Sequence, residues 1–319
     1  MRQATYEIID FHPSLTSMKE EVSFGLSQTQ KVLPPKLFYD KKGSHLFNEI
    51  TKLPEYYLTT AEKQILSRHR QDLALKMGEH CTIIDFGCGN EEKVQLLFGA
   101  LSNITAYVPV DISTAALEQT LKEMRISFPD LSIKGVRADY GVSMSFLDHF
   151  QNAKRVFTFF GSTLGNFSLK EQEDFLQKAA SHMREGDGFL LGIDLKKDKQ
   201  VLEAAYNDSE GITESFNKNV LRRMNKELAM NFDLSKFEHV AFYNEEAGRI
   251  EMHLVSNTVQ QVSLDNDTFT FRKNETIHTE NSYKFSVDQG VNLLKKAGLT
   301  TDMICEDENN QFCMLYAVQ

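Results

Sequence analysis

Short apolar runs alternate with amphipathic segments between residues 82 and 194. The strand-like runs are 82–86, 106–111, 133–139, 155–160 and 188–194, and the segments with helical spacing are 91–102, 113–124, 144–150 and 168–183. Ser113 stands at the N-cap position of the second of these helices. Strands that alternate with helices in this way predict a parallel sheet covered on both faces, with ligands at the carboxyl ends of the strands.

A different pattern follows residue 197. Two helical segments, 199–207 and 211–228, precede strand-like stretches at 239–244, 250–257, 260–264, 268–273 and 275–285. Helices followed by antiparallel strands are typical of an α+β architecture, so we interpret this part as an insertion. The earlier pattern then returns, with a helix at 287–299 and strands at 303–306 and 312–318.

The predicted fold class is therefore α/β: a seven-stranded, Rossmann-like sheet domain with a second, discontinuous α+β domain. The sheet domain comprises residues 61–196 plus 286–319, and the second domain comprises residues 1–60 plus 197–285. The length of 319 residues agrees with two domains of ordinary size.

Composition and charge exclude several classes of protein. Hydrophobic residues make up 41% and charged residues 25%, which excludes wholesale disorder, and the net charge of −10 disfavours nucleic acid as a partner. We find no apolar run long enough to span a membrane, no signal-peptide pattern at the start, and no C-x-x-C spacing among the four cysteines. We expect a reduced, cytoplasmic protein, and a monomer. The nine histidines contain no i, i+4 pair, so no metal site is expected.

The first candidate chemistry lies where the strand 82–86 ends. Gly87 and Gly89 form a Gly-x-Gly turn there, in which a ligand can approach the backbone closely. A dinucleotide fold requires a third glycine, but that position is Glu92, whose carboxylate would repel a pyrophosphate. The turn alone is a weak signal, and Asp85 could serve only to cap it.

Acidic residues follow the next two strands. Asp111 ends the second strand, where a carboxylate can hold two ribose hydroxyls. Asp139 and Tyr140 end the third, where an acid beside an aromatic ring suits an adenine. Together these residues predict an adenosine pocket without a phosphate clamp, and therefore S-adenosylmethionine as the cofactor.

Three segments carry a family resemblance. They are Leu33–Phe47 with its continuation Leu53–Tyr57, the Phe-Phe-Gly-Ser-Thr-Leu-Gly-Asn run at 159–166, and Ile277–Phe285 with its Thr-Glu-Asn-Ser element. Nearly the whole chain resembles the histidine-specific methyltransferases, whose best-known member makes Nα-trimethylhistidine (hercynine) on the route to ergothioneine. Fungal relatives that methylate an indole amino acid share the fold.

The resemblance implies a class I methyltransferase fold and a set of site residues. It assigns cofactor binding to Gly87, Lys93, Asp111, Asp139 and Tyr140. It assigns binding of the amino-acid substrate, L-histidine, to Tyr56, Gly161, Asn166, Tyr206, Glu280, Asn281 and Ser282, with Phe47 and Met252 as pocket walls. Tyr39 matches a tyrosine close to the reacting amine, and is the candidate catalytic residue.

The residue types agree with these roles. Glu280 and Ser282 are two apart on a predicted strand and can face one side together, where they could hold the two nitrogens of an imidazole. An indole offers one N–H and would leave one group unpaired. Simpler interpretations stay open: Asn166 as a turn residue, Tyr206 and the Met252 strand as ordinary core, and His278 as either near the pocket or on the surface.

From these residues we expect trimethylation of the α-amine of L-histidine by S-adenosylmethionine, giving hercynine. The alternatives are an Nα-methyltransferase of another amino acid, such as tryptophan or a derivative, and a ligand-binding relative without catalysis. A nicotinamide-dependent oxidoreductase is disfavoured by Glu92.

Overall fold

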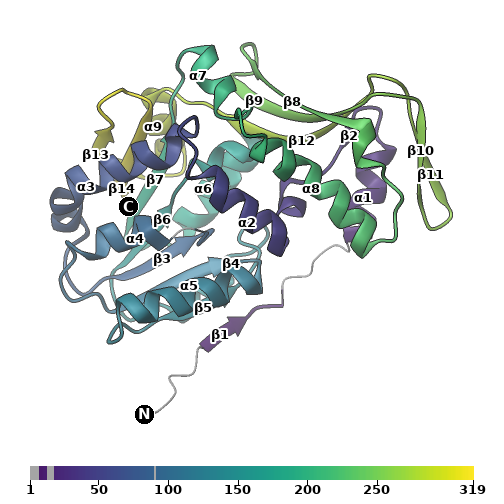
Figure 1. Ribbon diagram of the computed structural model, residues 1–319. Coiled ribbons are helices and arrows are strands. Elements are labelled where there is room, and N and C mark those ends of the chain that lie inside the picture. Colours follow the sequence, from purple (N-terminus) through teal and green to yellow (C-terminus); the bar gives the residue numbers. More distant parts are fainter. Residues whose placement is uncertain (1–6, 13–17, 90) are drawn as a thin grey trace. The chain divides into compact units, whose positions relative to one another are not determined.

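The computed structural model describes residues 7–12, 18–89 and 91–319, and the chain forms two compact units (Figure 1). The first unit contains the described residues of 1–13, 58–196 and 284–319, and the second contains those of 14–57 and 197–283. Contacts thus divide the chain after residues 13, 57, 196 and 283, whereas the sequence predicts boundaries after residues 60, 196 and 285.

The first unit is built on an eight-stranded sheet with the order β1-β5-β4-β3-β6-β7-β14-β13. Its strands are β1 (Glu7–Asp10), β3 (Thr82–Phe86), β4 (Ala106–Asp111), β5 (Lys134–Arg137), β6 (Arg155–Phe159), β7 (Gly188–Asp194), β13 (Thr300–Glu306) and β14 (Phe312–Val318). The strands from β1 to β7 pair in parallel, and β14 runs antiparallel to both of its neighbours. This topology confirms the predicted Rossmann-like fold.

Helices cover this sheet. They are α3 (Tyr57–Met77), α4 (Glu91–Phe98), α5 (Thr114–Ser127), α6 (Leu169–His182) and α9 (Val287–Lys296), with 3-10 helices η2 (Ser145–His149) and η3 (Thr163–Asn166). Figure 1 shows α5 along β4 and β5, while α9 packs on β13, β14 and α6. Because the central strands β3, β6 and β7 are buried at every residue on both faces, they are mostly apolar and lack a strict alternation of apolar and polar positions. Ser113 caps α5 as predicted, accepting from the Ala116 N–H at 3.3 Å.

The N-terminal strand is a correction to the sequence prediction. Residues 1–60 were assigned to the second domain, but β1 pairs with β5, from Glu7 opposite Lys134 to Asp10 opposite Arg137. The Asp10 carboxylate also accepts from Arg137 at 2.9 Å. The seven predicted strands therefore gain an eighth at the sheet edge, which is too short and too polar to read from its pattern.

The second unit holds a four-stranded sheet, β2-β12-β9-β8, and a separate hairpin of β10 and β11. Its strands are β2 (Lys31–Val32), β8 (Phe237–Asn244), β9 (Arg249–Ser256), β10 (Gln260–Leu264), β11 (Asp267–Phe271) and β12 (Thr276–Tyr283). Its helices are α1 (Met18–Ser27), η1 (Pro35–Phe38), α2 (Lys41–Ile50), α7 (Lys199–Ala204), α8 (Ile212–Glu227) and η4 (Leu234–Lys236). The predicted antiparallel strands are present, and β2 joins them in parallel with β12.

Candidate active site

In the first unit, the turn after β3 requires glycine at Gly87. Its φ of +72° lies in the left-handed region, and a Cβ there would stand 3.3 Å from the Tyr140 hydroxyl. The Gly87 N–H donates to the Val110 carbonyl at 2.9 Å, which ties the turn to the end of β4. The structure therefore brings the predicted cofactor residues Gly87 and Tyr140 together.

The two predicted carboxylates follow neighbouring parallel strands. Asp111 ends β4, is half-buried and accepts from the Ser113 N–H at 2.8 Å; burial raises its pKa to about 6. Asp139 follows β5 and accepts from the Gly141 N–H at 3.0 Å. Tyr140 stands edge-on to Phe86, with ring centroids 5.5 Å apart, and burial raises the pKa of its phenol, which stays neutral.

Asp85 has a different place from the turn cap that the sequence allowed. It is buried within β3, where it accepts from the Thr158 hydroxyl at 2.7 Å and the Tyr107 hydroxyl at 2.9 Å. Burial raises its pKa to about 6, although both hydrogen bonds act in the opposite direction. Asp85 thus links three neighbouring strands below the cofactor turn.

Lys93 and Gly161, predicted for cofactor and substrate, meet at one carboxylate that the sequence did not indicate. Glu62 of α3 is fully buried, and Lys93 lies 2.6 Å from it. The Gly161 N–H donates to both Glu62 oxygens at 2.9 and 3.1 Å. Asn166 ends η3 at the same end of β6, with a half-buried side chain.

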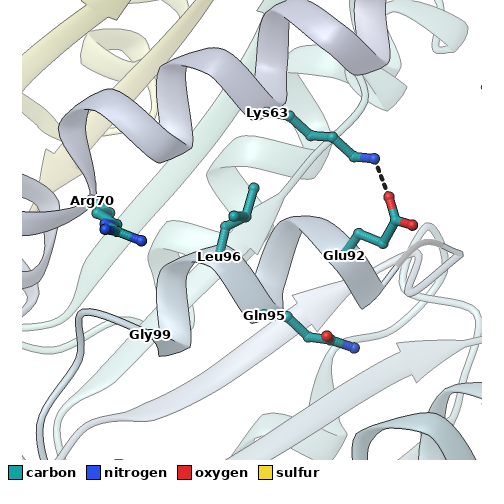
Figure 2. Close-up of a pocket in the computed structure, with 6 residues that line it drawn as sticks. All are labelled: Lys63, Arg70, Glu92, Gln95, Leu96 and Gly99. Carbon is teal, nitrogen blue, oxygen red and sulfur yellow. Dashed lines mark hydrogen bonds and ion pairs between the residues drawn. The ribbon is translucent and has the colours of Figure 1, made fainter. Parts of the chain in front are cut away.

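Glu92 lies outside this group. Its side chain is exposed and pairs with Lys63 of α3, above a surface pocket between α3 and α4 (Figure 2). That pocket is lined by Lys63, Arg70, Glu92, Gln95, Leu96 and Gly99, none of which is a predicted site residue. Because Lys63 neutralises Glu92, the carboxylate is a weaker argument against a pyrophosphate ligand than the sequence alone implied.

In the second unit, the predicted aromatic residues form one cluster. Tyr39 and Phe47 have ring centroids 5.8 Å apart, and Phe47 and Tyr56 stand 6.3 Å apart, all in edge-on geometry. Phe216 of α8, which the sequence did not single out, contacts both Tyr39 and Phe47, at 5.6 and 5.9 Å. Tyr39, Phe47 and Tyr56 are half-buried, so part of each ring is open to a ligand.

A β-bulge in β12 sets the faces of its side chains. Pairing with β9 runs from His278 opposite His253 to Glu280 opposite Met252, which leaves Thr279 as the extra residue. The bulge places Glu280 on the Met252 face while His278 stays on the opposite face. The Thr279 hydroxyl holds the bulge by donating to the Asn217 side chain at 2.8 Å and the Met252 carbonyl at 3.0 Å.

Ser282, on the same face as Glu280, meets another predicted substrate residue. The Tyr206 hydroxyl donates to the Ser282 hydroxyl at 2.8 Å, and both residues are buried. The Tyr206 carbonyl contacts His239 Nε2 at 2.8 Å, and His239 Nδ1 contacts the Asn217 amide at 2.8 Å. The structure thus joins Tyr206 and Ser282 as a pair and supports them through His239 and Asn217.

Asn281 and His278 lie away from that pair. Asn281 pairs with Glu251, so its side chain falls on the opposite face from Glu280 and Ser282, contrary to its place in the predicted set. His278 shares that opposite face and stacks on His253, with ring centroids 4.6 Å apart. The bulge therefore places His278 away from Glu280 and Ser282, which contradicts the interpretation that His278 lies near the predicted imidazole-binding pair.

Across the described residues, the one group with metal-ligand spacing is Glu251, His253 and His278. The check for i, i+4 histidines could not have found it, because these side chains come from paired strands. Arg249 and Asn244 already bond to Glu251, each at 2.9 Å, and hold its pKa down at about 2. A cation there would face the Arg249 charge, so we assign the group no metal role.

The sequence missed Glu62, Phe216, Asn217, His239 and Thr279. Each lies in an element whose pattern is ordinary: a buried glutamate in a helix resembles a solvent-facing one, and an asparagine in α8 carries no motif. Only Thr279 stood inside a recognised segment, where the strand pattern gave no sign of a bulge.

Comparison with known proteins identifies the family. The model of a family described as histidine-specific, S-adenosylmethionine-dependent methyltransferases matches residues 18–319. The chain belongs to this family. The predicted resemblance, the S-adenosylmethionine cofactor and the methyltransferase activity are thereby confirmed. The substrate is a small molecule, an amino acid.

Named relatives agree with this assignment. The chain is 36% identical over 309 residues to histidine N-alpha-methyltransferase of Mycolicibacterium smegmatis, covering 95% of each chain. It is 36% identical over 308 residues to the protein of the same name from Mycobacterium tuberculosis, again covering 95% of each. Ergothioneine biosynthesis protein 1 of Schizosaccharomyces pombe is 30% identical over 289 residues, which cover 87% of this chain and 37% of that protein. In the described part of the chain, no helix combines the length and the apolar character needed to cross a membrane.

Proposed function

We propose that this methyltransferase transfers three methyl groups to the α-amine of L-histidine and releases hercynine, a step of ergothioneine biosynthesis. S-adenosylmethionine, when bound, supplies each methyl group from its sulfonium centre. The proposal includes a monomeric, cytoplasmic enzyme, as expected in the sequence analysis.

The observation that carries the proposal is the paired arrangement of Glu280 and Ser282 on one face of the bulged strand β12. Glu280 is 8% and Ser282 3% exposed, so both are buried polar groups beside Met252. A carboxylate accepts one imidazole N–H, and a hydroxyl can donate to the other nitrogen. A ligand with two ring nitrogens can bond to both groups, whereas an indole, with a single N–H, can bond to only one of them.

The residues predicted for the cofactor suit an adenosine. Gly87 leaves space beside the Tyr140 hydroxyl that a Cβ would fill, and Asp111 ends the neighbouring strand with a carboxylate. At neutral pH Asp111 is ionised, because its pKa of about 6 lies below 7, and an ionised carboxylate can accept from both ribose hydroxyls.

Three successive methylations need an amine that is held only indirectly. The sequence prediction assigns the imidazole to Glu280 and Ser282 and the carboxylate to Asn166 and Tyr206, an assignment in which the amine can turn after each round. The half-buried rings of Tyr39, Phe47 and Tyr56 can tolerate the growing cation through cation–π attraction of about 0.5–2 kcal/mol. A phenol is a poor base at neutral pH, so Tyr39 orients the amine or relays its proton rather than removing it alone.

The test is the product of a reaction with excess S-adenosylmethionine. The purified protein is incubated separately with L-histidine, L-tryptophan and L-phenylalanine, and the products are analysed by tandem mass spectrometry. We expect histidine to gain three methyl groups on its α-nitrogen and the other amino acids to react far more slowly. A product that stops at one methyl, a methyl on the imidazole ring, or faster reaction of tryptophan would contradict the proposal.

A further inference from the structure

A buried carboxylate in α3 has partners that a purely structural group would not need. Glu62 is fully buried, and an ionised carboxylate out of contact with water is costly unless it is paired and hydrogen-bonded. Its bonds run to the Lys93 ammonium, at 2.6 Å, and to the Gly161 N–H, at 2.9 and 3.1 Å. The same carboxylate therefore fixes a side chain of α4 and the backbone after β6.

Lys93 and Gly161 are predicted to bind different ligands. Lys93 lies in α4, the helix that follows the glycine turn, and is a predicted cofactor residue. Gly161 follows β6 and is a predicted substrate residue. Glu62 reaches both from α3, a helix that carries none of the predicted site residues.

Two glycines clear the space for this arrangement. A Cβ at Gly192, in β7, would stand 2.6 Å from Glu62 Oε1, so only glycine leaves room for the carboxylate. Gly161 has a φ of +71°, and a Cβ there would lie 3.4 Å from Lys93 Nζ. The chain thus keeps side chains away from both members of the ion pair.

A second buried ion pair in the same unit gives a contrast. Arg155 and Asp187 lie at the amino ends of β6 and β7, and Asp187 accepts from the Arg155 guanidinium at 2.6 and 3.0 Å and from the Arg155 N–H at 2.8 Å. The guanidinium also donates to the carbonyls of His182 and Leu147. That pair is satisfied by the protein itself. For Lys93, Glu62 accounts for one of three N–H donors, which leaves donors for an anionic group of a ligand.

We propose that Glu62 is a positioning residue for methyl transfer, which holds the Lys93 ammonium and the Gly161 N–H in register for the cofactor and the amino acid. The inference rests on the proposed function only for the roles assigned to Lys93 and Gly161. In this proposal Lys93 is the residue that binds the cofactor, and Glu62 acts through it.

The test measures binding of S-adenosylhomocysteine, which needs no turnover, by calorimetry. Glu62→Gln keeps an oxygen that can accept from the Gly161 N–H but removes the charge that holds Lys93. We expect the Kd for S-adenosylhomocysteine to rise about tenfold to a hundredfold, the range for a charge-assisted hydrogen bond. The KM for S-adenosylmethionine should rise with it.

A double-mutant cycle separates positioning from general destabilisation. In a Lys93→Met background, Glu62→Gln should change the Kd less than about twofold, because the group through which Glu62 acts is gone. Equal effects of Glu62→Gln in both backgrounds, or a Kd within twofold of the wild type, would overturn the proposal. The matched control is Lys63→Gln, which removes the exposed ion pair between the same two helices and should leave the Kd unchanged (Figure 2).

If Glu62→Gln does not fold, Gly192→Ala decides the question by the same titration. The new methyl displaces the carboxylate without changing its charge, so the Kd should rise about threefold to tenfold, and an unchanged Kd overturns the proposal. Failure of the wild-type protein to methylate histidine would contradict the proposed function. The binding measurements do not depend on turnover, so they would still test the role of Glu62.

Discussion

The two units of the chain present their candidate residues in different ways. In the first unit, Gly87 and Asp139 follow parallel strands directly and Asp111 ends one, so strand topology alone brings them to one edge of the sheet. In the second unit, Glu280 and Ser282 lie within a strand, and a bulge at Thr279 decides which way they face. A regular fold therefore suffices to build the predicted cofactor site, whereas the predicted imidazole site depends on one irregular residue.

If this division is correct, a change in one unit should affect one ligand. Glu280→Ala should lower kcat/KM for histidine about a hundredfold, since the loss of a charge-assisted hydrogen bond costs about 3 kcal/mol. Tryptophan should then be rejected less strongly, because no buried carboxylate is left without a partner. Steady-state kinetics with both amino acids, and calorimetry with S-adenosylhomocysteine, measure the two effects.

The cofactor affinity should stay within about twofold of the wild type in that variant. Glu238→Ala, which removes an exposed carboxylate from β8 of the same sheet, is the control and should change neither quantity. An unaltered ratio of histidine to tryptophan turnover would place selectivity elsewhere.

The reciprocal change is in the first unit. Asp111→Ala should weaken S-adenosylhomocysteine binding about thirtyfold, or about 2 kcal/mol, because two ribose hydroxyls lose a charged acceptor. Calorimetry with purified protein is the measurement. Asp130→Ala, an exposed aspartate before β5, provides the control. Unchanged affinity would remove Asp111 from the site.

The smallest expected difference between the two units lies in how their stability depends on pH. Burial lowers the pKa of His239, His253 and His278, all in the second unit, below the usual 6.5. The unfolded chain then takes up these protons at higher pH than the folded chain, so the stability they contribute is present above pH 6.5 and is lost as the pH falls through the lower, folded values. In the first unit, Asp85 has a raised pKa of about 6, so its contribution is lost as the pH rises through 6 and is regained on acidification.

Hydrogen exchange at pH 7 and pH 5.5, corrected for the intrinsic rate, resolves the two units. Protection of β8, β9 and β12 should fall about threefold to tenfold at the lower pH, while β3 and β4 should keep or gain protection. Parallel loss of protection in both units would show that their proton linkage does not differ in this way.

Much of the first unit could be predicted because its signals are local. The strands β3, β6 and β7 are short, mostly apolar runs, and predicted site residues follow β3 and β6. The two-residue strand β2 and the edge strand β1 gave no signal, because each depends on a partner more than a hundred residues away. Glu62 could not be found either, since a glutamate in a helix indicates a solvent-facing position unless its tertiary partners are known.

The helices and strands of the second unit could be predicted, but the strand faces on which its side chains lie could be predicted less well. Alternation correctly put Glu280 and Ser282 on one side, but it put His278 there as well, because a bulge changes the count by one residue. The partners of Tyr206 are Ser282 of β12 and His239 of β8, which lie 76 and 33 residues away along the chain, and a single sequence does not specify such contacts. The resemblance to a family supplied these residues; the pattern did not.

The place of β14 in the large sheet has a consequence for biosynthesis. β14, residues 312–318, lies between β7 and β13, so β13 joins the sheet only through it. On the ribosome, β7 is made more than a hundred residues earlier and keeps an unpaired edge until synthesis has passed residue 318. Such an edge invites pairing with another nascent chain, so the fold remains exposed to aggregation from the completion of β7 until β14 has been made.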